Sequence, residues 1–162
     1  MTDEAVRVLD TSLFFEPFAA EDLRWLRTEG AVVTAEADEV FSREGEPADK
    51  FYVLVDGTVE LSTAPAADDL RRSHRSPLRT VVAPGQPLGW SAFRPPYRYS
   101  DSVRSHRPSR LLRLPRSSFD DLFARDPAVA HELLRRVNVQ VVKQLEFTRE
   151  LFDSPQAQGQ EL

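Results

Sequence analysis

Apolar residues near the N-terminus recur at spacings typical of helices. Four of them set this pattern: Leu9, Leu13, Phe14 and Phe18. Pro17 interrupts it, because a proline inside a helix removes a backbone hydrogen bond. The pattern therefore predicts two short helices within residues 9–30, the second ending near Gly30.

Residues 31–115 have a different pattern, in which short apolar runs alternate with turn residues. Asp56-Gly57 stands between the apolar runs 51–55 and 58–62, so it predicts a β-hairpin. The polar stretch 64–77 predicts a long loop. Many short strands at close spacing indicate a mainly β domain, either a sandwich or a barrel.

Residues 116–153 are predicted to be helical again. Ser117 or Ser118 is expected to cap a first helix, and Asp126-Pro127 to begin a longer one. The longer helix has one apolar stripe, about 37 Å long at 1.5 Å per residue. The stripe has Thr148 in register and otherwise consists of Leu134, Val137, Val141, Leu145 and Phe152.

We therefore divide the chain into a mainly β domain with its N-terminal helices and the helix that follows the strands (1–126), a long C-terminal helix (127–153) and a tail (154–162). The stripe of the long helix has two possible partners. It can pack back on its own barrel, or it can pair with a second copy as a parallel coiled coil. We favour the pairing, because the stripe extends beyond the expected edge of the β domain. The chain is thus predicted to be a homodimer.

Composition excludes several kinds of site and location. The chain has no cysteine, which excludes disulfides and thiolate chemistry and indicates a reducing compartment. The acidic N-terminus does not resemble a signal peptide. No apolar run approaches the roughly 20 residues that cross a bilayer. We expect a cytoplasmic protein with no membrane partner.

Charge is unevenly distributed along the chain. The net charge is −5, yet residues 71–116 contain 11 arginines and a single acid, Asp101. A basic middle within an acidic chain points to an anionic ligand or surface partner. No basic run is continuous enough to predict a nucleic-acid-binding arm.

The segment 84–103, PGQPLGWSAFRPPYRYSDSV, contains the most informative group of residues. A Pro-Gly turn and Gly89 precede a short helix start at 90–93, and Arg98 follows a Pro-Pro pair. Glycine permits close backbone approach, unpaired amides at a helix start favour negative charge, and arginine binds phosphate or carboxylate in a bidentate manner. Together these residues predict a cradle for an anion.

Three stretches, in this order and spacing, support a family assignment: VFSREGEP at 40–47, FYVLVDGTV at 51–59 and PGQPLG at 84–89. The chain resembles a stand-alone cyclic-nucleotide-binding domain of the catabolite-activator (Crp/Fnr-like) regulators, from about Leu9 to Phe152. The resemblance implies an eight-stranded jelly-roll barrel with flanking helices, the last of which usually dimerises. It also implies a phosphate-binding cassette beginning at Gly89.

The cassette departs from the family pattern at two positions. The family's ribose-binding glutamate is replaced by Trp90, whose indole can only donate a hydrogen bond. The family's phosphate-binding arginine aligns with Tyr99, and Arg98 lies one residue earlier. We expect Arg98 to make the charged contact. The resemblance then implies these ligand-binding residues: Leu88, Gly89, Trp90, Ser91, Ala92, Arg98, Tyr99 and Ser100.

Enzymes and DNA-binding proteins fit the sequence less well. The three histidines lack the close pairing of jelly-roll metal enzymes, and no Gly-x-Ser-x-Gly elbow or phosphate loop is present. We expect no catalytic residue, no metal and no bound cofactor other than a cyclic nucleotide or another phosphorylated ligand. About ten residues follow the long helix, too few for a helix-turn-helix, so direct DNA binding is not expected.

Two hypotheses remain open. In the first, the chain is a ligand-sensing regulatory module that binds a nucleotide or other anionic small molecule and signals through its last helix to a protein partner that the sequence does not identify. In the second, it is a dimeric interaction module that has lost its ligand.

Overall fold

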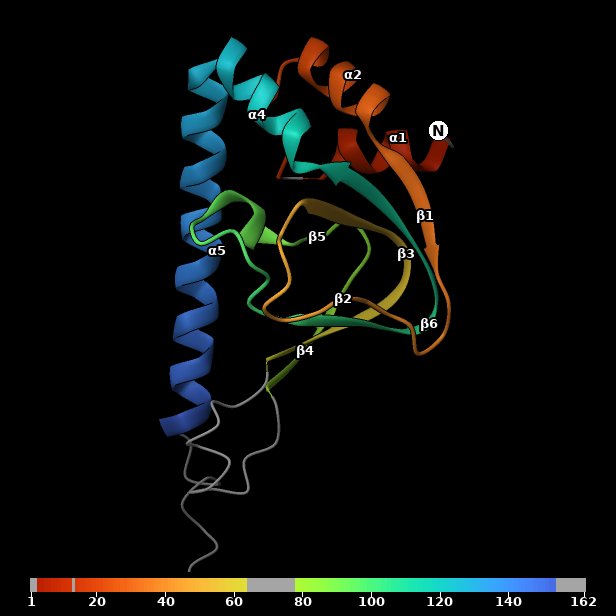
Figure 1. Ribbon diagram of the computed structural model, residues 1–162, viewed down its shortest axis with the longest axis vertical. Coiled ribbons are helices and arrows are strands. Elements are labelled where there is room, and N and C mark those ends of the chain that lie inside the picture. Colours follow the sequence, from red (N-terminus) through yellow and green to blue (C-terminus); the bar gives the residue numbers. More distant parts are fainter. Residues whose placement is uncertain (1–2, 13, 64–77, 154–162) are drawn as a thin grey trace, which may run out of the picture.

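The computed structural model describes residues 3–12, 14–63 and 78–153 (Figure 1). The predicted loop 64–77 and tail 154–162 lie outside the described residues. The elements, in chain order, are α1 (Asp3–Thr11), α2 (Ala20–Glu29), β1 (Ala31–Ala35), β2 (Val40–Ser42), β3 (Lys50–Thr63), β4 (Leu78–Val82), β5 (Pro87–Leu88), the 3₁₀ helix η1 (Trp90–Phe93), β6 (Ser102–Pro115), α4 (Arg116–Arg125) and α5 (Pro127–Asp153).

The strands form one curved antiparallel sheet of the cyclic-nucleotide-binding jelly-roll type. Its order is β1-β6-β3-β4, with β2 paired to β6 and β5 paired to β3. The two 14-residue strands, β3 and β6, pair along almost their whole length and bend to enclose the barrel interior (Figure 1). The mainly β fold with flanking helices is as predicted.

The hairpin predicted at Asp56-Gly57 is wrong. Strand β3 continues through both residues, and only the register against β6 shifts there. Gly57 has a φ of +115°, and a Cβ on it would lie 2.2 Å from Oγ of Ser109. The glycine therefore serves close strand approach at a bulge rather than a turn. The described residues form six strands rather than the eight expected, and the uninterrupted β3 accounts for one of the two fewer.

Alternate residues of β3 face two separate cores. Phe51 and Val53 pack with the helices, whereas Tyr52 and Leu54 face the barrel interior. This two-residue alternation is that of a strand with both faces covered. Helices α1, α2 and α4 lie together at one end of the barrel, and α5 runs along its side and past its far end (Figure 1).

Two helix starts differ from the predictions. Helix α1 begins at Asp3, so it lies earlier in the chain than residues 9–30 suggested. Helix α4 begins at Arg116, and neither Ser117 nor Ser118 caps it. Strand β6 continues to Pro115, whose φ of −62° suits a helix entry, so both serines already lie in the first turn.

Helix α5 begins as its sequence predicts. Asp126 Oδ1 accepts hydrogen bonds from the amides of Ala128 (2.9 Å) and Val129 (3.3 Å), and Pro127 occupies the first turn. Further along the helix, the carboxylate of Glu132 accepts hydrogen bonds from Arg135 and Arg136. These bonds, those of Arg135 first, lower the pKa of Glu132 to about 2.

One part of the apolar stripe of α5 is buried and another part is exposed. Val137, a predicted dimer contact, is instead 4% exposed and packs into the core of its own domain beside Leu133, which the predicted stripe did not include. Leu134 and Val141 are 46% and 38% exposed. Packing on the barrel thus accounts for part of the stripe and leaves another part open. The side chains of three other predicted contact residues, Leu145, Thr148 and Phe152, are not among those that the structure describes.

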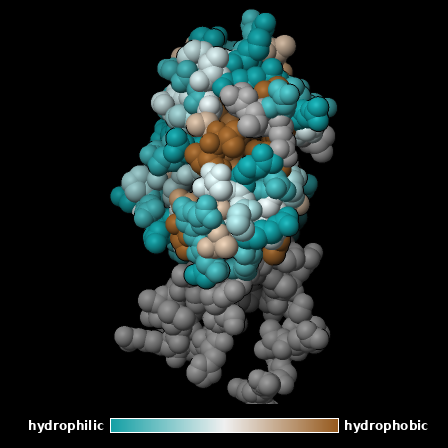
Figure 2. All heavy atoms as spheres, turned by 90° about the vertical axis from the view of Figure 1, so that its right-hand side faces the viewer, coloured by the Kyte–Doolittle hydropathy of each residue, from teal (hydrophilic) through white to brown (hydrophobic). Residues whose placement is uncertain are grey.

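Figure 2 shows the side of the molecule away from α5. Hydrophilic residues cover most of this face and surround one apolar area in its upper half. Among the described helices, none combines the length and apolar character needed to span a membrane.

Candidate ligand pocket

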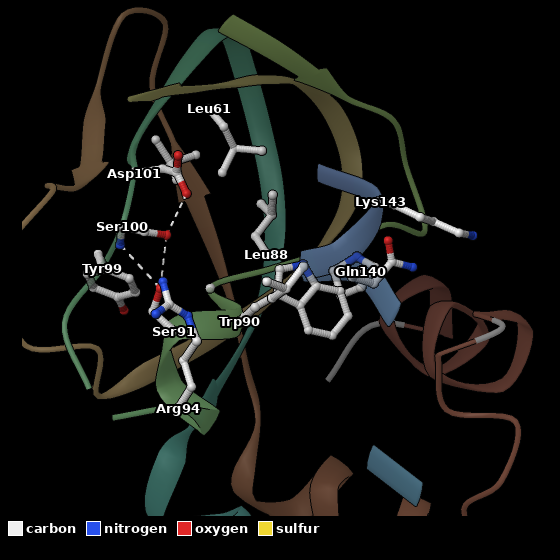
Figure 3. Close-up of a pocket in the computed structure, with 14 residues that line it drawn as sticks. Leu61, Leu88, Trp90, Ser91, Arg94, Tyr99, Ser100, Asp101, Gln140 and Lys143 are labelled. Atoms are coloured by element: carbon white, nitrogen blue, oxygen red, sulfur yellow. Dashed lines mark hydrogen bonds between the residues drawn. The ribbon is translucent and has the colours of Figure 1, made fainter. Parts of the chain in front are cut away.

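A pocket of about 320 Å³ lies between the barrel, η1 and α5 (Figure 3). Its apolar wall comes mainly from the strands, through Leu61, Leu88 and Val103. Its polar residues come from the cassette and from α5. The complete lining is Leu61, Pro87, Leu88, Gly89, Trp90, Ser91, Arg94, Tyr99, Ser100, Asp101, Val103, Gln140, Val141 and Lys143. Mixed apolar and polar walls of this kind suit a small organic ligand.

Gly89 positions η1 against the barrel. Its φ is +84°, and a Cβ there would lie 3.0 Å from the carbonyl oxygen of Lys50. The Gly89 carbonyl accepts the amide of Ala92 (3.0 Å), which closes the turn of η1. Glycine is thus required for the left-handed backbone and for the close approach to β3.

Two serines and an aspartate form a hydrogen-bonded row along the polar wall (Figure 3). Ser91 Oγ accepts the amide of Ser100 at 3.2 Å and lies 3.2 Å from its hydroxyl oxygen. Ser100 Oγ in turn donates to Oδ2 of Asp101 at 2.8 Å. The row links η1 to the chain entering β6, so these side chains are held in place before any ligand binds.

Tyr99 contributes its ring but no charge. It is 7% exposed, and its hydroxyl donates to the carbonyl of Lys50 at 2.9 Å. Burial first, and then the nearby Tyr52, raise the pKa of Tyr99 well above its usual range. The residue that aligns with the family's arginine is therefore a neutral phenol turned toward β3.

The indole of Trp90 fills space in the helical core. It packs edge-on against Phe14 (centroids 4.8 Å apart) and Phe51 (5.5 Å). The residue is half-buried and also lines the pocket. Trp90 thus lies between the ligand pocket and the segment that follows α1.

The two cassette arginines differ in position. Arg98, expected to make the charged contact, donates instead to the carbonyl of Gly45 (2.7 Å) and does not line the pocket. Arg94 does line it, and its guanidinium has no hydrogen-bond or ion-pair partner among the described residues. Figure 3 shows this guanidinium directed toward Ser91. Arg94 is the cassette cation that faces the pocket.

Of the eight residues proposed from the sequence, six line the pocket together, while Arg98 and Ala92 do not. Ala92 is buried against Ala48 and Tyr99 instead. The sequence analysis missed Arg94, although it lies in the same cassette and could have been weighed against Arg98. It also missed the wall residues that come from other elements: Leu61, Val103, Gln140, Val141 and Lys143.

No metal centre is found in the part of the chain that the structure describes, where no three histidine, aspartate or glutamate side chains gather. His106 Nε2 lies 3.0 Å from Oε2 of Glu60, which is a strand-to-strand pair on β6 and β3. This pair lies outside the pocket lining.

Solved structures of similar fold are numerous. A protein described as a possible cyclic nucleotide-binding protein from Geobacter metallireducens is 23% identical with a TM-score of 0.72, over 90% of this chain and 99% of that one. The N-terminal domain of a transcriptional regulator from Streptomyces coelicolor is 25% identical with a TM-score of 0.65, covering 87% and 94%. The regulatory domain of Toxoplasma gondii PKA, crystallised with cAMP, is 22% identical with a TM-score of 0.64, covering 74% and 43%.

Sequence comparison gives the family directly. No protein of curated function matches this chain. Residues 32–126, however, match the profile of the cyclic nucleotide-binding domain, and they run from the second residue of β1 to the end of α4. This match covers more than half of the 162 residues. The chain belongs to the cyclic nucleotide-binding domain family.

Proposed function

We propose that this domain is a regulatory sensor that binds a nucleotide or another anionic small molecule in the pocket and signals through α5. The observation that carries the proposal is Arg94, a guanidinium that lines the pocket without a partner among the described residues. An arginine in this state favours an oxyanion, because it can donate two parallel charge-assisted hydrogen bonds. No residue is assigned a catalytic role.

The neighbours of Arg94 support the same ligand class. Ser91 and Ser100 place hydroxyl groups on the polar wall, and the opposite wall is apolar. A phosphorylated compound with a planar or apolar body satisfies both walls. The related regulatory domain of Toxoplasma gondii PKA was crystallised with cAMP, which agrees with a nucleotide as the first candidate.

Signalling follows from the position of α5. Helix α5 lines the same pocket as the barrel and η1, through Gln140, Val141 and Lys143. A bound ligand would therefore contact the barrel and α5 at the same time. In Figure 3 the Lys143 ammonium extends away from the other labelled residues, so its stem rather than its charge faces the pocket. A ligand that binds one position of α5 better than another shifts the helix toward that position. The exposed residues Leu134 and Val141 would carry this change to a second copy or to another protein.

A thermal-shift screen of nucleotides and phosphate esters tests the proposal. A ligand at about 100 times its Kd adds about 2.7 kcal/mol to the free energy of unfolding. Arg94→Ala should abolish the shift, because it removes the pocket cation. Arg98→Ala is the matched control and should retain the shift, because that guanidinium binds Gly45 outside the pocket. If no anionic compound shifts the wild-type Tm, or if only Arg98→Ala abolishes the shift, the proposal is overturned.

A second candidate is a dimeric interaction module without ligand. Trp90 favours it, because the indole occupies the position of the family's hydroxyl acceptor and packs into the core. This candidate predicts a dimer by analytical ultracentrifugation together with a flat thermal-shift screen. The sensor is compatible with a dimer as well but predicts a Tm that rises with ligand, so the thermal-shift screen is the measurement that separates the candidates.

A further inference from the structure

A second pocket lies where the start of β3, the end of β6 and the start of α4 meet. Its volume is about 600 Å³, and it shares no lining residue with the pocket beside η1 and α5. Three cations line it, one from each element: Lys50 from β3, Arg113 from β6 and Arg116 from α4. The hydroxyl-bearing Ser117 lines it as well. These residues form a cluster of donors outside the site already described.

Two of the three cations are paired with acids that also line this second pocket. Lys50 Nζ lies 3.3 Å from Oδ1 of Asp49, and Arg116 Nε lies 3.7 Å from Oδ2 of Asp120. All four side chains are at least 30% exposed, so each pair is weak. An ammonium group has three N–H donors and a guanidinium has five, so both cations keep donors for a ligand.

Arg113 is the third cation, and it has no hydrogen-bond or ion-pair partner among the residues that the structure describes. It is half-buried and lies opposite Tyr52 in the pairing of β6 with β3. Burial raises the pKa of Tyr52, and the charge of Arg113 acts in the opposite direction. The guanidinium thus lies beside the barrel wall, where reduced solvation strengthens its attraction for an anion.

Arg116 is held in place before any ligand binds. Its guanidinium carbon lies 3.7 Å from the centroid of the Tyr97 ring, and its amide donates to the carbonyl of Asp49 at 2.9 Å. Tyr97 has a φ of +58°, which is uncommon for a residue other than glycine. Its carbonyl accepts the amide of Ala48 (2.8 Å), and its amide donates to the carbonyl of Arg94 (2.9 Å). The ring that supports Arg116 is therefore fixed by the backbone.

We propose that the second pocket binds a phosphoryl dianion, as a site separate from the pocket beside η1 and α5. A phosphoryl group has three strong acceptor oxygens, which match cationic donors from three elements. A cyclic phosphodiester carries a single charge and fits this pocket less well. The bound group would connect β3 and β6 to α4, which leads directly into α5. Inorganic phosphate and a phosphorylated metabolite offer the same group, so the test includes both.

NMR titration of the full chain, labelled with ¹⁵N, tests the site. The probes are inorganic phosphate and glycerol 3-phosphate at about pH 8, above the second phosphate pKa of about 6. The amide signal of Ser117 should shift saturably with both. It should not follow cyclic AMP, or sodium chloride at equal ionic strength. Tighter binding of glycerol 3-phosphate would identify a metabolite as the source, and equal Kd values would identify the free ion.

Substitutions of lining residues test the charges separately. Arg113→Ala should weaken the Kd about tenfold or more, because it removes the unpaired donor. Asp49→Asn should tighten it about twofold to fivefold, because it removes a repelling charge. Arg104→Ala is the matched control, since Arg104 is exposed on β6 outside this pocket, and it should keep the wild-type Kd. If Arg113→Ala does not fold, the opposite effects of Asp49→Asn and Lys50→Ala decide the question.

Three results would overturn the proposal. The first is no saturable shift with either phosphate, and the second is a shift of the same size with chloride. The third is a Kd that Arg94→Ala weakens and Arg113→Ala does not, which would assign the phosphates to the pocket beside η1 and α5. None of these measurements depends on nucleotide binding, so this proposal and the proposed function can fail separately.

Discussion

Replacing Trp90 with alanine tests whether the indole is a core residue as well as a pocket residue. The ring is half-buried and meets Phe14 and Phe51 edge-on. Truncation removes both contacts and leaves a cavity between η1 and the segment after α1. The fold therefore loses stability even when no ligand is present.

The size of this loss follows from the buried area. A half-buried indole hides on the order of 100 Å² of apolar surface, worth about 2.5 kcal/mol at about 25 cal/mol per Å². Two edge-on aromatic contacts add about 0.5 kcal/mol each. The sum, about 3.5 kcal/mol, agrees with the lower part of the range for tryptophan truncations in cores.

Urea denaturation monitored by far-UV circular dichroism measures this loss directly. For a chain of this length, about 3.5 kcal/mol corresponds to a Tm lower by roughly 7–14 °C. Val139→Ala is the control, because Val139 is 40% exposed on α5 and its truncation should change stability by less than about 0.5 kcal/mol. A loss below about 1 kcal/mol in Trp90→Ala would refute the packing argument and indicate an indole that lies free in the pocket.

Three further predictions concern the cassette and α5. Gly89→Ala should cost more stability in urea than Gly85→Ala, by about 1–2 kcal/mol, because both have a φ of +84° but only Gly89 would place its Cβ against backbone. An equal cost in the two variants would contradict the close-approach argument. The pKa of Glu132 lies at about 2, below its ordinary 4.5, so its hydrogen bonds from Arg135 and Arg136 stabilise the fold above pH 4.5 and are lost as the pH falls toward 2. NMR titration of the carboxyl carbon should give this low midpoint, and a midpoint near 4.5 would contradict the paired geometry. Val137→Asp should unfold the domain by burying a charge, whereas Val141→Asp should leave it folded and, if the helix pairs between copies, convert a dimer to a monomer in sedimentation.

Features set by local chemistry could be predicted from the sequence. Asp126-Pro127 combines a side-chain cap with a proline in the first turn, so the start of α5 is marked by residues adjacent in the sequence. The strands within residues 31–63 and 78–115 follow in the same way from apolar runs between turn residues.

Features set by tertiary contacts could not be predicted. Asp56-Gly57 has the same local chemistry in a hairpin and in a bulge, and only the approach of Ser109 distinguishes the two. The choice between Arg94 and Arg98 depends on an isolated bridge between Pro47 and Arg98, which turns the latter toward Gly45. The contribution of α5 to the pocket depends on how the helix packs across the barrel.

The fluorescence of Trp90 gives the most direct test of whether Arg94 binds an anionic ligand in the pocket. The chain has two tryptophans, so Trp25→Phe leaves Trp90 as the single reporter at the pocket wall. Titration of this variant with cyclic AMP and the other nucleotides should give a saturable change for the bound compound. Adding Arg94→Ala should weaken the Kd by about tenfold or more, and adding Arg98→Ala should leave it unchanged. Equal Kd values with and without Arg94, or a loss that follows Arg98 instead, would contradict the proposed anion pocket.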